Sequence, residues 1–243
     1  MKSAVIIPAR YASTRFPGKP LALLKGKPLI RHVYENASKS SLAGSIVVAT
    51  DSQEIFDTVT GFGGIAIMTS TNHASGTDRC FEAAGHMDCD IIVNVQGDEP
   101  LIEPQMIDDV IGLLEDKRAS ISTLVNKITD IRDIQDPNIV KAVSDNEGFA
   151  LYFSRAPIPY SREGLWTETT YYKHIGIYGY RRETLRRLSE MPQSGLERAE
   201  KLEQLRALEC GMRIKVKETF FEIIGVDTPE DLERVDKWLS SSS

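Results

Sequence analysis

Residues Val5–Leu29 read VIIPARYASTRFPGKPLALLKGKPL and join an apolar run to a long loop. Val5, Ile6 and Ile7 predict a central parallel strand that is buried on both faces. We expect Pro8 to end this strand, because proline cannot donate a hydrogen bond to a sheet ladder. The loop leaves the carboxyl end of the strand, where ligands bind in open α/β sheets. The stretch therefore predicts an α/β fold with a ligand-binding loop near the N-terminus.

Positive charge is concentrated in the same part of the chain. Residues 1–34 contain no Asp or Glu, although the whole chain has a formal net charge of -6. They contain seven cations, namely Lys2, Arg10, Arg15, Lys19, Lys25, Lys27 and Arg31. Most runs of charged residues lie on the solvated surface. A basic run that follows the end of a buried strand indicates instead a binding site for a small anionic ligand. Nucleic acid would require a broad basic surface. Gly18-Lys19 is followed by Pro20, which argues against a Walker-type P-loop.

The composition is that of a globular protein. With 243 residues, 41% hydrophobic and 26% charged, the chain predicts one domain with an elaboration. Its apolar runs are shorter than the ~20 residues of a membrane span, and no signal peptide pattern precedes the first strand. We expect a cytoplasmic protein without a membrane partner. Cys80, Cys89 and Cys210 lack C-x-x-C spacing, so we expect buried thiols and neither disulfides nor a zinc site.

Strand and helix patterns alternate after the loop. The expected strands cover residues 45–50, 65–68, 91–95, 120–125, 139–143, 149–153, 173–180 and 215–224. The expected helices follow Pro28, Ser52 and Thr77 and cover residues 104–116, 197–208 and 229–239. The runs at 139–143 and 149–153 predict an antiparallel hairpin, so the sheet should be mixed. Gly61–Ala66 matches a dinucleotide fingerprint by letters, but it follows a helix and precedes a strand, which excludes a nicotinamide cofactor.

Five stretches carry a family resemblance. The loop PARYASTRFPGKPL, from Pro8, resembles the signature loop of sugar-activating nucleotidyltransferases, specifically of the 3-deoxy-manno-octulosonate (Kdo) cytidylyltransferase, or CMP-Kdo synthetase, family. Four later stretches are similar to the same family, namely His73–Arg79 (HASGTDR), Asn94–Pro100 (NVQGDEP), Tyr152–Pro159 (YFSRAPIP) and Gly225–Leu232 (GVDTPEDL). The matches span nearly the whole chain, and several are seven or more residues long, which makes the resemblance specific.

The resemblance implies a Rossmann-like, three-layer nucleotidyltransferase fold of the glycosyltransferase-A type. Its central sheet would be mixed but mostly parallel, with a small substrate and dimerisation lobe. Within a single domain of residues 1–243, residues to about 130 are expected to bind CTP and about 131–215 to bind the sugar and form a homodimer. Residues 216–243 would form a strand and a helix that return to the metal site. The implied reaction converts CTP and Kdo into CMP-Kdo and pyrophosphate for lipopolysaccharide biosynthesis.

Nucleotidyl transfer requires a neutralised triphosphate and a stabilised leaving pyrophosphate. We expect Arg10 and Lys19, assisted by Arg15, to bind the phosphates. The resemblance implies that Asp98 and Asp227 bind Mg²⁺, a hard cation that takes one or two carboxylates plus phosphate oxygens. Arg10, Lys19, Asp98 and Asp227 are then the expected catalytic residues. The resemblance also implies cytosine recognition by Ala9, Ser13, Ser75, Arg79 and Gln96. For Ser75 a purely structural helix cap is the alternative.

The acceptor sugar requires a different set of residues. Its carboxylate needs an arginine, and the sequence does not decide between Arg155 and Arg162. Its hydroxyl would be activated by Mg²⁺, which lowers the pKa of a bound hydroxyl. His174 and Tyr178 share one face of the expected strand. The resemblance places the remaining sugar contacts at Gln96, His174, Tyr178, Glu203 and Gln204.

Two alternatives remain open. Another acidic sugar, such as 8-amino-Kdo or sialic acid, could be the acceptor, because the match is poorly defined between Tyr160 and Tyr172. A non-catalytic nucleotide-binding regulator on the same fold would bind CTP without turnover, although two metal-binding aspartates argue against it. Homodimer formation is compatible with aromatic residues that we expect to be exposed, Trp166, Tyr171 and Tyr172.

Overall fold

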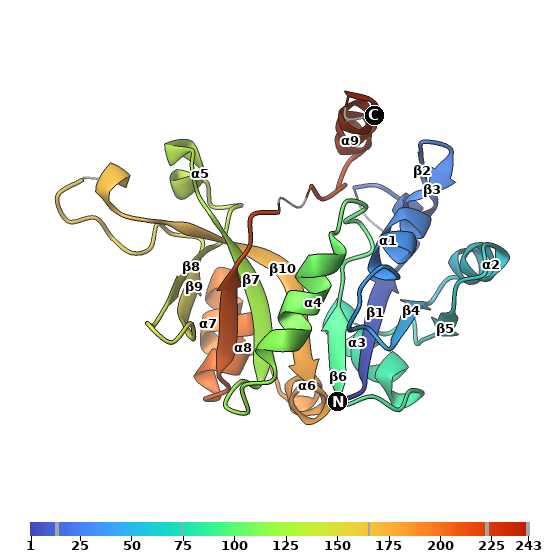
Figure 1. The fold of residues 1–243 in the computed structure, drawn as a ribbon, viewed down its shortest axis with the longest axis horizontal. Helices are drawn as coiled ribbons and strands as arrows, with labels where there is room; N and C mark the ends of the chain where they lie inside the picture. The colour runs from blue at the N-terminus through green and yellow to red at the C-terminus, as the bar shows by residue number, and fades with distance from the viewer. Residues whose placement is uncertain (13–14, 74, 165, 222–223, 242–243) are drawn as a thin grey trace. The chain divides into compact units, whose positions relative to one another are not determined.

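The computed structural model describes residues 1–12, 15–73, 75–164, 166–221 and 224–241, with only the backbone of Thr167 and Ser241. The chain divides into two compact units. The first is Met1–Asp108 with Ile223–Ser243, and the second is Asp109–Glu222. Figure 1 labels most of the helices and strands of both. These boundaries differ from about 130 and 215, where we expected the functional parts to end, and the roles of those parts stay predictions.

The first unit is built on a parallel sheet in the order β6-β1-β4-β5. Its strands are β1 (Ser3–Ala9), β4 (Ser45–Thr50), β5 (Ala66–Met68) and β6 (Ile91–Asn94), with a small hairpin of β2 (Leu23–Leu24) and β3 (Lys27–Pro28). Its helices are α1 (Leu29–Ala37), α2 (Gln53–Gly61), α3 (Gly76–Gly85) and α9 (Pro229–Ser241), with the 3-10 turn η1 (Lys19–Leu21). Helix α4 (Pro104–Leu113) contains the boundary between the units.

The strand order determines where this sheet can bind a ligand. From β1 the chain moves to β4 and β5, and then returns to β6 on the other side of β1. Because parallel crossovers are right-handed, α1 and α2 cover one face and α3 covers the other. The direction of winding reverses between β1 and β6, and ligands bind at such a point beyond the carboxyl ends of the strands. The loops after Ala9 and Asn94 are therefore the expected walls of a site.

Pro8 does not end the first strand, contrary to our expectation. β1 continues to Ala9, and Pro8 lies opposite Ala49 of β4. In a parallel strand, alternate residues point their backbone groups to opposite neighbours. The carbonyl of Ile6 accepts from Val95 on the β6 side, so Pro8 faces that same side, beyond the last paired residue of β6. The missing N–H of Pro8 therefore costs no ladder hydrogen bond.

The second unit is built on mixed strand pairing. β7 (Ile121–Lys127) pairs in parallel with β11 (Ile214–Glu218) and antiparallel with β10 (Tyr172–Arg181). The strands β8 (Lys141–Ser144) and β9 (Ala150–Ser154) form the antiparallel hairpin that the sequence predicted. The hairpin pairs with β10 through β8. The helices are α5 (Ile131–Gln135), α6 (Arg182–Glu190), α7 (Gly195–Glu200) and α8 (Gln204–Glu209), with the 3-10 turn η2 (Trp166–Glu168). Parallel and antiparallel pairs both occur, which confirms the mixed sheet.

Three further local predictions were wrong. The single helix expected at 197–208 is two helices, because Lys201 adopts the left-handed conformation (φ 55°) and ends α7. Cys210 is exposed, since it lies just beyond the end of α8. Tyr171, expected on the surface, is 2% exposed because it packs with Ile128 and Ile134. Each of these outcomes depends on how a short segment packs against the rest of its unit. The periodicity of apolar side chains does not predict such packing.

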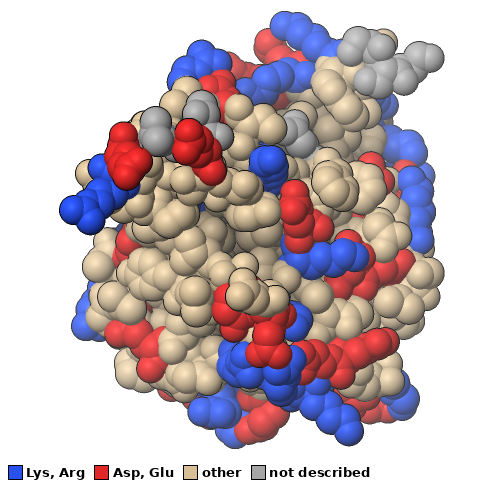
Figure 2. Space-filling model, turned by 60° about the vertical axis from the view of Figure 1, so that its left-hand side comes forward, with Lys and Arg blue, Asp and Glu red and all other residues tan. Residues whose placement is uncertain are grey.

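Charged side chains of both signs are interleaved on the face shown in Figure 2. The cations there lie beside Asp and Glu, uncharged residues fill the middle of the face, and no continuous basic surface is seen. Among the helices of the described residues, none has both the length and the apolar character that crossing a membrane requires.

Candidate active site

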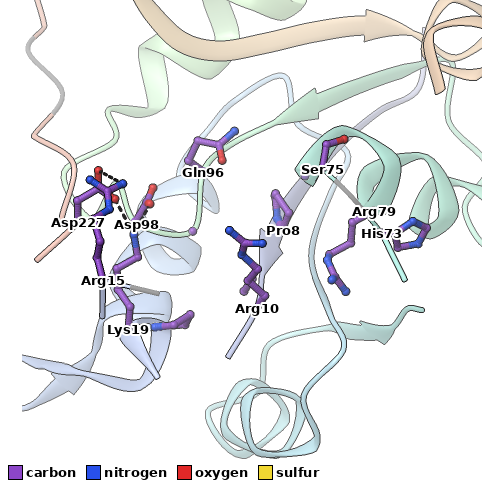
Figure 3. Close-up of a pocket in the computed structure, with 14 residues that line it drawn as sticks. Pro8, Arg10, Arg15, Lys19, His73, Ser75, Arg79, Gln96, Asp98 and Asp227 are labelled. Atoms are coloured by element: carbon purple, nitrogen blue, oxygen red, sulfur yellow. Dashed lines mark hydrogen bonds and ion pairs between the residues drawn. The ribbon is translucent and has the colours of Figure 1, made fainter. Parts of the chain in front are cut away.

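A pocket of about 560 Å³ lies in the first unit. Figure 3 shows its residues, with Lys19, Asp98, Asp227 and Arg15 gathered at one end and with Ser75, Arg79 and His73 at the other. Its wall consists of Pro8, Ala9, Arg10, Arg15, Lys19, Pro20, His73, Ser75, Gly76, Arg79, Gln96, Gly97, Asp98 and Asp227. The carboxyl ends of β1 and β6 both contribute to it, as the reversal in strand order predicts.

Gly97 allows the two strand ends to meet. A Cβ at this position would lie 2.9 Å from the carbonyl oxygen of Pro8, closer than real Cβ atoms come to backbone. Only glycine therefore lets the loop after β6 pass beside the end of β1. The side chain of Gln96, just before it, donates to Asn94 at 3.3 Å, and Asp98 follows at the pocket wall.

A lysine bridges two carboxylates at one end of the pocket. The ammonium of Lys19 lies 2.5 Å from Oδ2 of Asp98 and 3.1 Å from Oδ1 of Asp227. Arg15 adds an ion pair to Asp227 at 3.0 Å. The side chain of Lys19 is only 12% exposed, so its charge acts in a partly desolvated position. Two carboxylates thus converge on one cation, as a cation-binding site requires.

The loop from β1 holds Lys19 by backbone hydrogen bonds. The N–H of Gly18 donates to the carbonyl of Tyr11 at 2.9 Å, which closes the loop. Gly18 has φ of 70°, a left-handed conformation that glycine adopts without strain. Lys19 then begins the 3-10 turn η1, with Pro20 behind it. The loop geometry therefore presents Lys19 at a defined position on the wall.

Asp227 reaches the site from the far end of the sequence. The N–H of Val226 donates to the carbonyl of Asp98 at 2.9 Å, which ties the C-terminal segment to the loop after β6. Oδ2 of Asp231 accepts from the N–H groups of Asp227 and Thr228, while the Thr228 hydroxyl caps Asp231. Thr228 and Asp231 therefore form a capping box at the start of α9. Because Asp231 and Thr228 share the capping, the carboxylate of Asp227 stays available to Lys19.

The opposite end of the pocket contains a buried arginine. Arg79 is 4% exposed and donates to Oγ1 of Thr69 at 2.5 Å and to Oδ2 of Asp51 at 2.8 Å. Asp51 follows β4 and Thr69 follows β5, so the arginine joins two strand ends to α3. The Ser75 side chain caps α3 by accepting from Asp78 at 3.1 Å. A guanidinium offers only donors, which suits a base edge that carries acceptors.

Two further residues near the pocket were not anticipated as site residues. His73 lines the wall and hydrogen-bonds to Glu82, an interaction that lowers the pKa of Glu82 below its ordinary value. Glu99 is buried, and burial, followed by the charge of Asp98, raises its pKa to about 8. Oε2 of Glu99 has no hydrogen-bond partner among the described residues. Burial and the charge of Asp98 thus both disfavour a second negative charge on Glu99.

The structure brings most of the expected nucleotide residues together. The wall includes Ala9, Arg10, Arg15, Lys19, Ser75, Arg79, Gln96, Asp98 and Asp227. Ser13 lies outside the described residues, so its assignment stays a prediction. His73 belongs to a motif that the sequence singled out, but Asp51 and Thr69 carried no signal beyond their place at strand ends. Their contact with Arg79 depends on the order of β4 and β5 in the sheet.

The expected sugar residues, apart from Gln96, lie in the second unit. His174 and Tyr178 are neighbours on β10, with ring centroids 5.2 Å apart, and Tyr180 continues the row at 5.7 Å from Tyr178. Burial, together with the negative charge of Glu203, raises the pKa of the Tyr178 hydroxyl well above its ordinary value. Tyr178 and Glu203 are therefore close enough to interact. The shared strand face of His174 and Tyr178 is confirmed.

The other sugar candidates differ in how they are held. Arg155 donates to the backbone carbonyls of Glu200 at 2.7 Å and Pro137 at 2.8 Å, so its guanidinium already has structural partners. Arg162 is exposed and has no hydrogen bond or ion pair with the described residues. Gln204 begins the separate helix α8 and is 6% exposed. Their roles in sugar binding stay predictions.

Comparison with known proteins gives a consistent result. The protein-family model described as Cytidylyltransferase matches residues 4–214. The chain is 53% identical over 246 residues to the 3-deoxy-manno-octulosonate cytidylyltransferase of Geotalea daltonii, with 97% of each chain covered. It is 51% identical to the protein of the same name from Thermodesulfovibrio yellowstonii, with both chains fully covered. A solved CMP:2-keto-3-deoxy-manno-octonic acid synthetase complexed with CTP matches with a TM-score of 0.95 and 42% identity over both full chains. The expected fold class is confirmed by this likeness.

Proposed function

The chain belongs to the 3-deoxy-manno-octulosonate cytidylyltransferase family, and we infer that it transfers the cytidylyl group of CTP to Kdo, giving CMP-Kdo and pyrophosphate. The observation that carries this function is the pocket of the first unit. Four stretches that are far apart in the sequence meet there, and they bring a basic loop, a buried arginine and two carboxylates onto one wall. These are the groups that a nucleoside triphosphate and its metal ion require.

In the transfer, the acceptor hydroxyl loses its proton to solvent and its oxygen attacks the α-phosphorus of CTP. The bond from that phosphorus to the β-phosphate oxygen breaks, and pyrophosphate leaves with the electron pair. We assign the phosphates to the end of the pocket with Lys19 and Arg15, and Arg10 lies on the wall between the two ends. Cations placed there stabilise charge that builds on the leaving group. We assign the cytosine, whose O2 and N3 are acceptors, to the opposite end of the pocket, where Ser75 and Arg79 line the wall.

We propose Mg²⁺ as the cofactor, held by Asp98 and Asp227. The donor set fits, because the two carboxylates already converge on one cation, the ammonium of Lys19. Among the described residues no group of three or more His, Cys, Asp or Glu could hold a metal ion. Triphosphate oxygens would therefore complete the coordination, as is usual for Mg²⁺. When bound, the metal supplies charge neutralisation and lowers the pKa of the acceptor hydroxyl.

For the acceptor we propose that Arg162 binds the carboxylate, because the guanidinium of Arg155 already binds two backbone carbonyls. His174, Tyr178, Glu203 and Gln204 would contact the hydroxyls. Transfer to an amino-substituted Kdo or to sialic acid would keep the nucleotide pocket and change only these contacts. A regulator would bind CTP and release no pyrophosphate.

The test is pyrophosphate release by the purified protein with CTP and Mg²⁺. Kdo, 8-amino-Kdo and sialic acid are compared as acceptors, and Asp98→Asn serves as the inactive control. We expect release with Kdo and a loss of at least about a hundredfold in the control. Release only with another sugar acid would change the acceptor, and CTP binding without release from any acceptor would favour the regulator.

We further propose a cytoplasmic homodimer that supplies CMP-Kdo to lipopolysaccharide synthesis. What supports a dimer is the exposure of large apolar side chains in the second unit, which a second copy would cover. They are Ile131, Leu151, Tyr160 and Phe220, at 51%, 62%, 79% and 88% exposure. Light scattering at micromolar concentration tests the dimer, and a monomer would contradict it. The cytoplasm is the compartment that contains CTP.

A further inference from the structure

An irregular pairing lies in the second unit beside the expected sugar residues. Along β10, Ile175 pairs with Leu124 but Tyr178 pairs with Thr123, so Gly176 and Ile177 form a bulge. Bulges change the direction of side chains and are common next to active sites. Thr123, opposite the bulge, is fully buried. A buried hydroxyl needs hydrogen-bond partners. The partners of Thr123 indicate which ring nitrogen of His174 carries a hydrogen.

The partners of Thr123 determine which atoms carry hydrogen. Its Oγ1 lies 2.8 Å from the carbonyl oxygen of Ile177, 3.1 Å from that of Ile175 and 3.0 Å from Nε2 of His174. A carbonyl oxygen can only accept, and two oxygens 2.8 Å apart with no hydrogen between them repel each other, so we place the single hydroxyl hydrogen of Thr123 toward the carbonyl of Ile177. Toward His174 the oxygen can then only accept. With this placement, Nε2 of His174 carries a hydrogen and donates it to Thr123.

The ring of His174 is held in place and kept neutral. Phe153 packs edge-on against it at 5.1 Å between ring centroids, and Tyr178 lies 5.2 Å away on β10. Burial lowers the pKa of His174 to about 3. A neutral imidazole with hydrogen on Nε2 has a lone pair on Nδ1, which can only accept. Among the described residues, the ring makes its hydrogen bond to Thr123 alone.

We propose that Thr123 is a positioning residue that holds His174 as the Nε2–H tautomer, so that Nδ1 accepts a hydrogen bond from a hydroxyl of the acceptor sugar. The inference rests on the proposed function, because the sugar role of His174 comes from it. The proposal predicts which kind of group the acceptor sugar must present to His174. His174 would recognise a group that donates, and a sugar with a methoxy or deoxy carbon at that position would lose the contact.

The experiment compares Thr123→Val, which keeps the shape and removes the hydroxyl, with Thr123→Ser, which keeps the hydroxyl. Ser122→Ala is the matched control, since Ser122 is also fully buried and its hydroxyl bonds to the carbonyl of Val110 at 2.6 Å. The first readout is the ¹⁵N NMR spectrum of labelled histidine. The chain has four histidines, so His174→Asn assigns the signal. The second readout is KM for Kdo and for CTP.

We expect protonated Nε2 and bare Nδ1 in the wild type and in Thr123→Ser. Thr123→Val should show a mixture of tautomers and a KM for Kdo raised about five- to tenfold, the loss of one hydrogen bond, with KM for CTP unchanged. Ser122→Ala should match the wild type in both readouts. A wild-type spectrum with bare Nε2 would overturn the proposal even if Thr123→Val does not fold. Normal spectra and KM in Thr123→Val would also overturn it.

A failure of the proposed function can be distinguished from a failure of the positioning role of Thr123. If the wild type releases no pyrophosphate with Kdo, the proposed function is wrong, whatever the tautomer of His174. If the wild type is active and the tautomer is as expected, but KM for Kdo is unaffected in Thr123→Val, the positioning role is wrong and the function stands.

Discussion

At the scale of single residues, we expect catalysis in the pocket to depend on the charge of Lys19. Its ammonium lies within 3.1 Å of both Asp98 and Asp227 and is mostly shielded from solvent. A charge pair at about 4 Å contributes on the order of 4 kcal/mol at an effective dielectric near 20. Lys19→Met should therefore lower kcat by about two to three orders of magnitude. Steady-state kinetics with CTP, Kdo and Mg²⁺ measures it.

Lys39→Met is the control for this prediction, because Lys39 is an exposed cation whose ammonium bonds to Asn36. It should keep the activity of the wild type. Circular dichroism melts of both variants separate an effect on chemistry from unfolding. A Lys19→Met enzyme that is folded and retains more than about a third of kcat would show that this cation is not needed in the transition state.

At the scale of elements, helix α9 is predicted to support the proposed Mg²⁺ site through its first turn. Thr228 and Asp231 cap the helix, and Asp231 also accepts from the N–H of Asp227. Thr228→Ala should cost about 1 kcal/mol of folding free energy, as the loss of an N-cap does. It should also raise the Mg²⁺ concentration needed for half-maximal activity, because Asp227 becomes less ordered. Urea unfolding and a Mg²⁺ titration measure the two effects.

Thr228→Ser retains a capping hydroxyl and should behave as the wild type in both measurements. Loss of stability without any change in the Mg²⁺ titration would show that the cap serves the helix alone. The signals for this element are local, so the sequence predicted it correctly. The break at Lys201 had no such signal, because a left-handed lysine is not among the residues that usually end helices.

At the scale of the whole molecule, His174 is expected to couple folding to pH. Burial holds its folded pKa at about 3, below the ordinary 6.5. Between these values the unfolded chain binds a proton that the folded protein does not, so stability is fully present above pH 6.5 and falls as pH decreases. The slope from this one group is at most about 1.4 kcal/mol per pH unit. Urea unfolding between pH 7 and pH 4 measures it.

In His174→Gln the free energy of unfolding should fall less steeply over the same range, even if the variant is less stable at pH 7. His86→Gln is the matched control, since His86 is exposed after the end of α3. Its slope should remain that of the wild type. Equal slopes in the two variants would mean that His174 does not resist protonation in the folded protein.

The sequence by itself determined the local features of this protein. The apolar run of β1, the basic loop with Gly18 and Lys19, the hairpin of β8 and β9 and the capping box of α9 all follow from residues close together in the chain. The metal-binding role of Asp98 was implied by the family resemblance, and its place in the loop after β6 agrees with the ligand edge of a parallel sheet. These features depend on backbone preference and short-range periodicity, which the sequence contains.

Only the tertiary structure decided which distant groups meet. Asp227 is 208 residues from Lys19, and Thr123 is 51 residues from His174. Asp51 and Thr69 reach Arg79 because β4 and β5 are neighbours, and Thr123 reaches His174 because a bulge changes the register of β10 against β7. Strand order and register arise from packing of the whole chain. No single segment contains them, so the ligand wall could be predicted in outline but its hydrogen-bond partners could not.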